Sequence, residues 1–376
     1  MKKAFIGFFA LVGICTSLIY FYEAVFLRYT RLFKTCPYFS KKISFHNVYD
    51  FNSEVHFENI NNSFLKSNKL LIKDQKTNKC LPLINFLKDN HIPTDLFLRI
   101  KNIPNLQKIL ETQNLIIEVK YNDLNSYKKV SCPKNSFVIA FFGQSNTTNQ
   151  ISQKFDLKIP NNLYQYNWRD KNCYLFKEPL LGNTGLGGNA ITPFAATIAK
   201  ETQQNIVLVT FGQGGSVIES WSQGGFSPIL RDVLQGLKGS GLSPDIFLWH
   251  QGESNAINAQ RVPNTIKEDS FSKEYLNNLL LLIDNTRKYF PDSYFGISLV
   301  SVCGFDRPYS YITNSQRKAS TLRKKVYIAA DSDSLIGQEF RSDINCHFNQ
   351  NGAVQLGNMY RKSLKNNILD FKFFSK

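Results

Sequence analysis

Three short motifs in the last two-thirds of the chain combine polar side chains of the kinds that cleave esters. They are Gly143 to Asn146 (GQSN), Trp249 to Asn255 (WHQGESN) and Asp343 to Phe348 (DINCHF). A serine hydroxyl becomes an effective nucleophile when a base removes its proton during attack, and histidine has a pKa suited to that task. Together the motifs supply a nucleophile, an amide donor and an acid/base pair.

Ser145 is the candidate nucleophile because of its place relative to a predicted strand. Six consecutive apolar residues at 137–142 indicate a strand buried on both faces. Gly143 allows the chain to leave that strand sharply, and a strand end holds a hydroxyl in place while leaving it exposed. Thr147 stands where the Gly-x-Ser-x-Gly elbow of α/β-hydrolases has its second glycine, so that signature is absent. The alternative role for Ser145 is an ordinary helix N-cap.

The second motif offers an amide and a carboxylate after another predicted strand. Gln251 follows the apolar run at 245–249 and carries an NH2 group, and Glu253 follows two residues later. The alternative is polar loop chemistry, with Glu253 capping a helix.

A glycine-rich segment follows the apolar run at 206–211. Gly214 and Gly215 lack a side chain, so a ligand can approach their backbone N–H groups closely. The alternative is a tight turn between a strand and a helix.

His347 is the candidate base. Of the five histidines, it alone has a carboxylate four residues upstream, Asp343, and a helix-like stretch directly after it, at 352–365. Asp331 and Asp333 are other acids nearby. The alternative is a histidine on the surface or in a satisfied polar contact.

The elements that must hold these residues alternate along the chain. Strands are expected at 137–142, 206–211, 245–249, 295–302 and 326–330, and helices at 193–202, 226–237, 270–289, 314–323 and 352–365. Alternation of this kind indicates a parallel sheet with helices on both faces. Ligands then bind at the carboxyl ends of the strands, where all the motifs fall.

Between the first two predicted strands lies a long segment with a possible hairpin. Its aromatic residues could stack on sugar rings or form a local core; they are Tyr164, Tyr166, Trp168 and Tyr174.

From Ser136 to Lys365 the chain resembles the SGNH hydrolase superfamily, and within it the sialate O-acetylesterase-like carbohydrate esterases. The resemblance rests on GQSN, WHQGESN, and the run from Ala330 to Leu335 followed by Cys346-His347-Phe348. It implies an α/β three-layer sandwich with a flavodoxin-like parallel sheet.

The resemblance also implies residue roles. Ser145 would be the nucleophile and His347 the general base and acid. The oxyanion hole would consist of the backbone N–H of Ser145, that of Gly215 with Gly214 as the alternate, and the side chain of Gln251. Asn146 and Glu253 would support the site.

One position departs from the family pattern, which spaces the acid and the histidine as D-x-x-H. Ile344 stands at the acid's place, and Asp343 is one residue further upstream. We expect a bulge in the loop to bring Asp343 to the imidazole as the third triad member. The alternatives are Asp331 or Asp333, or a Ser–His dyad.

The expected activity is a serine esterase that removes O-acetyl or other short acyl groups from a carbohydrate. The same site would serve an O-acetyltransferase acting on a glycan, or could survive in an inactive glycan-binding protein. We expect no cofactor and no metal, because no His, Cys and carboxylate grouping has zinc spacing and no phosphate-binding loop is present.

Composition and periodicity divide the chain into three parts. Residues 1–35 form a membrane anchor and juxtamembrane segment, 36–130 a β-rich accessory domain, and 131–376 the catalytic domain. The alternative for the middle part is an N-terminal extension packed on the catalytic domain.

The N-terminus carries an uncharged run from Ala4 to Tyr22 after two lysines. About 20 residues span a bilayer as a helix, and the run lacks a clear cleavage site. We therefore expect an uncleaved anchor with the catalytic domain exported, periplasmic or extracellular; the alternative is secretion after signal cleavage.

Cysteines and charge fit an exported protein. Six cysteines outside the apolar run permit up to three disulfides in an exported protein; the alternative is six unpaired, mostly buried thiols in a cytosolic one. We expect Cys303 and Cys346 to be paired, or close enough to pair, beside His347. The net charge is +16, but the lysines are scattered and no nucleic-acid motif is present. The expected partners are an acylated polysaccharide and the membrane, not nucleic acid, and the oligomeric state is left open.

Overall fold

The structure is a computed structural model of the chain. It describes residues 126–183, 185, 187–260, 268–342 and 345–368, together with four strands at 40–46, 70–73, 80–82 and 114–120. The chain divides into two compact units, one with the four-stranded sheet and the other with an eight-stranded sheet.

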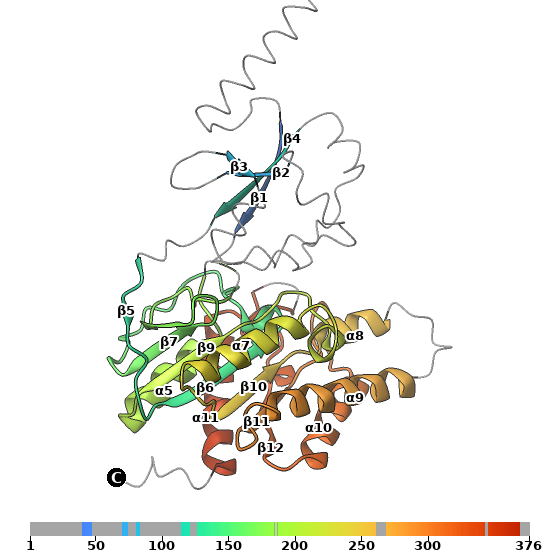
Figure 1. The fold of residues 1–376 in the computed structure, drawn as a ribbon. Coiled ribbons are helices and arrows are strands. Elements are labelled where there is room, and N and C mark those ends of the chain that lie inside the picture. Colours follow the sequence, from blue (N-terminus) through green and yellow to red (C-terminus); the bar gives the residue numbers. More distant parts are fainter. Residues whose placement is uncertain are drawn as a thin grey trace, which may run out of the picture. The chain divides into compact units, whose positions relative to one another are not determined.

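The eight-stranded sheet is mainly parallel (Figure 1). In pairing order its strands are β12 (Val326–Asp331), β11 (Tyr294–Leu299), β10 (Ile246–His250), β6 (Phe137–Gly143), β9 (Ile206–Thr210), β7 (Leu163–Asn167), β8 (Asn172–Leu175) and β5 (Lys129–Val130). From β12 to β7 all neighbours run parallel, and β8 and β5 extend the sheet antiparallel. The five strands predicted for a parallel sheet are therefore confirmed, with a hairpin added at one edge.

Helices follow the strands in the described part of the chain. They are α5 (Thr192–Thr202), α6 (Ile218–Ser222), α7 (Ser227–Gly239), α8 (Glu253–Gln260), α9 (Glu268–Arg287), α10 (Ser310–Leu322) and α11 (Gln350–Asn367), with two 3-10 turns, η2 (Ser145–Thr147) and η3 (Ser332–Ser334). All five predicted helices are present. Asn349 begins α11, because its side chain accepts a hydrogen bond from the N–H of Gly352.

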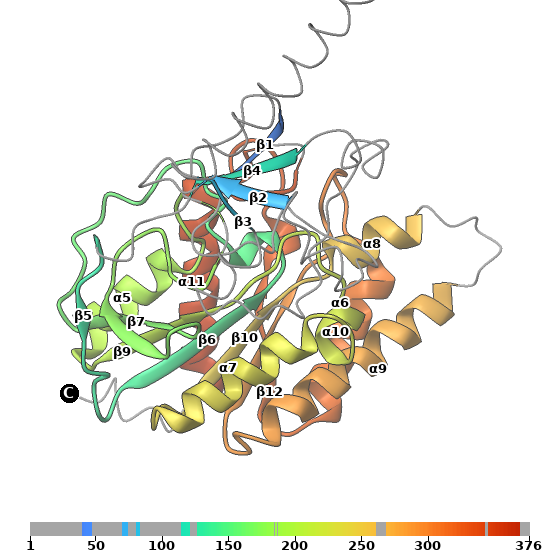
Figure 2. The same ribbon diagram turned by 45° about the horizontal axis from the view of Figure 1, so that its top comes forward.

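The central strands β6, β9 and β10 are buried at every position, so both faces of the sheet must be covered by helices. Phe137, Ile139 and Phe141 belong to a core shared with α5 and α11. Phe142 points to the other face, where it stacks on Phe211 at 4.7 Å between ring centroids and packs edge-on against Trp221 of α6. Figure 2 shows α7 and α11 on opposite sides of the sheet. The result is the predicted three-layer α/β arrangement.

The predicted hairpin is β7 and β8, but its aromatic residues do not form an exposed sugar-binding face. Tyr166, Trp168 and Tyr174 are buried. The indole N–H of Trp168 donates to the carbonyl of Gly182, and the hydroxyl of Tyr166 lies 3.1 Å from that of Ser240. Aromatic rings with a satisfied polar tip of this kind form part of a core.

The smaller sheet pairs in the order β1 (Ser40–His46), β4 (Asn114–Lys120), β2 (Leu70–Lys73) and β3 (Cys80–Pro82). All four strands lie within the region 36–130 that was predicted to be β-rich. In the part of the chain that the structure describes, no helix has the length and apolarity to cross a membrane. The predicted anchor at 4–22 lies outside that part, and so does Asp343.

Candidate active site

Ser145 stands where β6 ends, at the carboxyl edge of the sheet. It begins the turn η2 and is almost fully buried. Gly143 makes this exit possible: its φ is +146°, and a Cβ there would overlap the carbonyl oxygen of His250 at the end of β10. The neighbouring strand ends thus lie close enough to join the first two motifs.

Asn146 connects the first motif to the third. Its amide Nδ2 donates to the carbonyl of Cys346 at 3.0 Å, and its Oδ1 accepts from the N–H of Phe348 at 3.1 Å. These two groups belong to the peptide units on either side of His347. The residue after the candidate nucleophile therefore holds the backbone of the candidate base.

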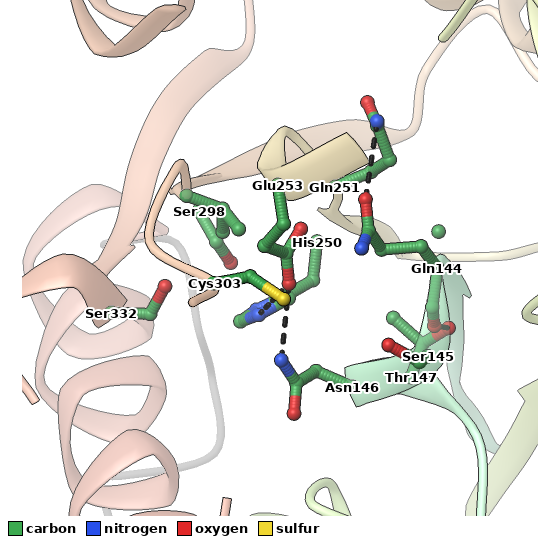
Figure 3. A network of polar contacts seen from close by, with 12 residues as sticks. Gln144, Ser145, Asn146, Thr147, His250, Gln251, Glu253, Ser298, Cys303 and Ser332 are labelled. Carbon is green, nitrogen blue, oxygen red and sulfur yellow. Dashed lines mark hydrogen bonds and ion pairs between the residues drawn. The ribbon is translucent and has the colours of Figure 1, made fainter. Parts of the chain in front are cut away.

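The remaining hydrogen of the Asn146 amide goes to Glu253. Nδ2 donates to Oε1 of Glu253 at 3.0 Å, as Figure 3 shows. This contact fixes the orientation of the amide, because a flipped amide would turn its oxygen toward the Cys346 carbonyl and the carboxyl group. Burial raises the pKa of Glu253 to about 7.

His250 lies beside Glu253 and is also fully buried. Its Nε2 is 4.0 Å from Oε1 of Glu253, and its Nδ1 lies 3.2 Å from the hydroxyl of Tyr360. Burial lowers the pKa of His250 to about 3, with a smaller contribution from the positive charge of Arg341. His250 is thus a neutral core histidine, as its place inside the sheet requires.

The loop that carries His347 is held by two further contacts. A disulfide joins Cys346 to Cys303, with their Cα atoms 4.0 Å apart, which confirms the predicted pair. Arg341 is buried and donates to the carbonyls of Ser332, Leu335 and Cys346, while its guanidinium lies 4.0 Å from the centre of the Phe348 ring. His347 itself is partly exposed and lies three residues before the first residue of α11.

Gln144 and Gln251 join the first and second motifs. Oε1 of Gln144 accepts from the N–H of Ser254. Nε2 of Gln251 lies 3.2 Å from the same oxygen (Figure 3). The same nitrogen lies 3.1 Å from the carbonyl of Ser216 and 2.7 Å from Oδ1 of Asn255. Gln251 is fully buried, and its two amide hydrogens face these three acceptors.

The glycine-rich loop after β9 borders the turn at Ser145. A Cβ on Gly212 would overlap the hydroxyl of Thr147, so glycine is required for this close packing. A Cβ on Gly214 would lie 3.9 Å from that of Ser145, and one on Gly215 would meet no atom within 4 Å. The loop therefore places backbone, without side chains, next to the candidate nucleophile.

Two of the three candidate acids are described. Asp333 is buried and accepts from the N–H groups of Ser301 and Val302 and the hydroxyl of Ser301; burial raises its pKa. Asp331 is exposed and lies 3.6 Å from Arg317. Asp333 thus organises the loop after β11, and Asp331 forms a surface ion pair.

Sequence reasoning missed Arg341 and gave no role to Gln144. Arg341 stands out only as a single arginine between the acidic run near 331 and His347, a weak signal. Gln144 belongs to a motif that was recognised, but its partners lie more than 100 residues away. Among the described residues, no three His, Cys, Asp or Glu side chains are grouped as a metal site.

Comparison with known proteins identifies a family for this chain. Residues 135–366 match the family model described as carbohydrate esterase, sialic acid-specific acetylesterase. No match was found among curated proteins.

Several solved structures are similar to part of this chain. An Arabidopsis thaliana protein is 19% identical with a TM-score of 0.48, over 62% of this chain and 100% of its own. A carbohydrate acetylesterase from Xanthomonas citri is 16% identical with a TM-score of 0.44, over 62% of this chain and 57% of its own. A family 3 carbohydrate esterase from Clostridium thermocellum is 13% identical with a TM-score of 0.38, over 63% of this chain and 98% of its own.

The family model spans more than half of the chain and includes all three motifs. The chain therefore belongs to the carbohydrate esterase family of sialic acid-specific acetylesterases and is a carboxylic ester hydrolase.

Proposed function

We propose that the protein is a serine O-acetylesterase of an acetylated glycan, with Ser145 as the nucleophile and His347 as the general base and acid. The observation that supports this most directly is the pair of hydrogen bonds from Asn146 to the peptides flanking His347. They couple the position of the base to the residue next to the nucleophile.

In the proposed mechanism, the Ser145 oxygen attacks the acetyl carbonyl carbon while His347 removes the hydroxyl proton. The resulting oxyanion is stabilised by the backbone N–H groups of Ser145 and of Gly215 or Gly214, and by Gln251. His347 then returns the proton to the sugar oxygen, which leaves as a hydroxyl, and the acetyl group stays on Ser145.

The second half of the reaction repeats these steps with water. His347 removes a proton from water as its oxygen attacks the acetyl carbonyl, and acetate leaves when the Ser145 oxygen takes the proton back. We propose Asp343 as the acid that orients the imidazole. Its place in the sequence, four residues before His347, supports that role.

Gln251 needs one rearrangement to serve as a donor. Its two amide hydrogens are shared among three protein acceptors, so it would exchange one of these contacts for the oxyanion. The nearby Gln144 contact is the longest of the three, at 3.2 Å.

The test combines active-site labelling with product analysis. A fluorophosphonate should label native protein and the control Ser320→Ala, in which a partly buried serine of α10 is removed, but not Ser145→Ala. Free acetate should appear from p-nitrophenyl acetate with the same dependence on Ser145. Labelling that survives in Ser145→Ala would show that the nucleophile is another residue. Transfer of the acetyl group to an added glycan, without release of free acetate, would identify a transferase.

We also infer that the catalytic domain is exported and is anchored through residues 4–22. Two disulfides in the domain support export, Cys132–Cys173 and Cys303–Cys346, because such bonds persist in oxidising compartments. Thiol-alkylation of intact cells before and after reduction tests this: the four cysteines should be modified only after reduction. Modification without reduction would contradict export.

A further inference from the structure

Three aromatic residues form a cluster on the loop after β11 and the start of α10. The ring centroids of Phe305 and Tyr309 are 5.0 Å apart, and those of Tyr309 and Tyr311 are 5.2 Å apart at a right angle. All three side chains are partly exposed, and none belongs to the buried core. We call Phe305, Tyr309 and Tyr311 the aromatic corner.

The loop that carries the aromatic corner is closed at its base. Ser301 donates its hydroxyl to Asp333 at 2.5 Å and accepts from the N–H of Tyr309 at 2.8 Å. Asp333 also binds the N–H groups of Ser301 and Val302. These contacts hold the first residues of the loop and Tyr309 at its end, so the backbone that carries the rings is restrained.

The same loop is bonded covalently to the loop of the catalytic base. Cys303 forms a disulfide with Cys346, the residue before His347. Phe305 follows Cys303 by two residues, a backbone path of at most about 7 Å. The Cα atom of Phe305 therefore lies within about 15 Å of that of His347, along a path through the disulfide.

Exposed charged residues accompany the rings of the aromatic corner. Residues 306 to 308, Asp-Arg-Pro, are exposed between Phe305 and Tyr309, so a carboxyl and a guanidinium group belong to the same short loop as the rings. A face of aromatic rings with hydrogen-bonding groups at its rim fits a ligand that has an apolar face and polar edges. A pyranose ring has this character, since its axial C–H bonds form a face and its hydroxyls an edge.

We propose that the aromatic corner binds a pyranose ring of the glycan substrate and holds the acetylated sugar at Ser145. The proposal rests on the proposed esterase function and adds the residues that select a glycan over a simple ester. One ring stacks on the sugar face, and the ring at a right angle bounds it.

The experiment measures a ratio of two activities, which cancels differences in folded fraction. For each variant, kcat/KM is measured on acetylated xylan, or on mucin carrying O-acetylated sialic acids, and divided by kcat/KM on p-nitrophenyl acetate. Loss of one aromatic stacking contact in Tyr309→Ala or Phe305→Ala should lower this ratio by about fivefold to tenfold. Tyr309→Phe keeps the ring and should restore most of it.

Tyr289→Ala is the matched control. This partly buried tyrosine lies between α9 and the first residue of β11, whereas the aromatic corner follows the carboxyl end of β11. The ratio for Tyr289→Ala should equal that of the native protein. An unchanged ratio in Tyr309→Ala and Phe305→Ala would overturn the proposal, as would native activity on p-nitrophenyl acetate with none on either glycan.

A second measurement separates this proposal from the esterase proposal. Ser145→Ala protein should be retarded in a gel containing the glycan, and adding Tyr309→Ala should abolish the retardation. If the native protein cleaves no ester, the esterase proposal fails, and gel retardation alone decides whether the aromatic corner binds sugar. Retardation that does not depend on Tyr309 would refute the corner as a sugar site.

Discussion

Asn146 holds His347 through the backbone on both of its sides. One amide hydrogen of Asn146 binds the carbonyl of Cys346, its oxygen accepts from the N–H of Phe348, and its other hydrogen binds Glu253. All the hydrogen-bonding capacity of the Asn146 amide hydrogens is used in this way. A base placed on a loop after a sheet gains precision from such a contact, because loops by themselves position side chains poorly.

Replacing Asn146 by Ala should lower kcat on p-nitrophenyl acetate by about two orders of magnitude, because a shift of about 1 Å in the base costs that much. The buried N–H of Phe348 would also lose its Asn146 acceptor, at about 1–3 kcal/mol in unfolding free energy, whereas the carbonyl of Cys346 would keep its contact with Arg341. Stopped-flow kinetics and urea denaturation measure the two effects. Asn351→Ala, on the exposed face of α11, is the control. A folded Asn146→Ala variant with native kcat would remove the residue from the mechanism.

Three aspartate variants identify the residue that orients His347. Asp343→Asn should lose several orders of magnitude in kcat, because an amide favours the wrong tautomer of the imidazole. Asp331→Asn should keep near-native activity, since Asp331 is exposed and contacts Arg317. Asp333→Asn should mainly lower the melting temperature, because its carboxylate holds Ser301 and Val302. Near-native kcat in Asp343→Asn would disprove the triad but leave Ser145 and His347 in place.

Gln251→Ala should lower kcat by roughly two orders of magnitude with little change in KM, as expected for loss of an oxyanion donor. Gln144→Ala separates this effect from positioning, because it removes a Gln251 partner and leaves the Gln251 amide. Gln144→Ala should therefore be the milder variant. Equal losses of kcat in both would assign Gln251 a purely structural role.

Loss of the Cys303–Cys346 disulfide should lower kcat per folded molecule, in addition to any loss of stability. The bond restrains the peptide before His347, so Cys303→Ser with Cys346→Ser should loosen the base. The double variant Cys132→Ser with Cys173→Ser is the control, since that disulfide lies at the β5 and β8 edge of the sheet. The control should lose stability and keep its kcat per folded molecule. The opposite pattern would contradict the restraint.

The buried carboxyl of Glu253 should make stability depend on pH. Its pKa is about 7 in the folded protein and near the ordinary value for Glu in the unfolded chain. Between about pH 4.5 and pH 7 the carboxyl of Glu253 holds its proton in the folded state but has lost it in the unfolded chain. Its contribution to stability is therefore full below about pH 4.5 and is lost as pH rises through about 7.

Glu253→Gln should abolish this pH dependence, because the amide cannot ionise and can still accept from Asn146. The difference in unfolding free energy between Glu253→Gln and native protein should grow in favour of the variant from pH 5 to 7, by at most about 1.4 kcal/mol per pH unit. Urea denaturation at each pH measures it, with Glu201→Gln as a control on the surface ion pair with Arg361. Parallel curves for Glu253→Gln and native protein would show that the carboxyl is already ionised.

The sequence by itself determined the secondary structure of the catalytic part and the order of its motifs. Runs such as 137–142 are apolar at every position, and only a strand with helices on both faces buries such a run. The placement of Ser145 and His347 followed from the same argument, because motifs after parallel strands meet at one edge of the sheet. The proximity of Cys303 and Cys346 was predictable for that reason as well.

Only the tertiary structure decided which side chains complete the site. Asn146 and Cys346 are 200 residues apart, and no local spacing predicts that one amide binds both peptides flanking His347. Arg341 acquires its role from three carbonyls that converge only when η3 and the His347 loop pack together. The aromatic residues show the same limit. Tyr166 and Trp168 are buried while Phe305 and Tyr309 are partly exposed, because burial depends on which strands and helices come to lie above each ring.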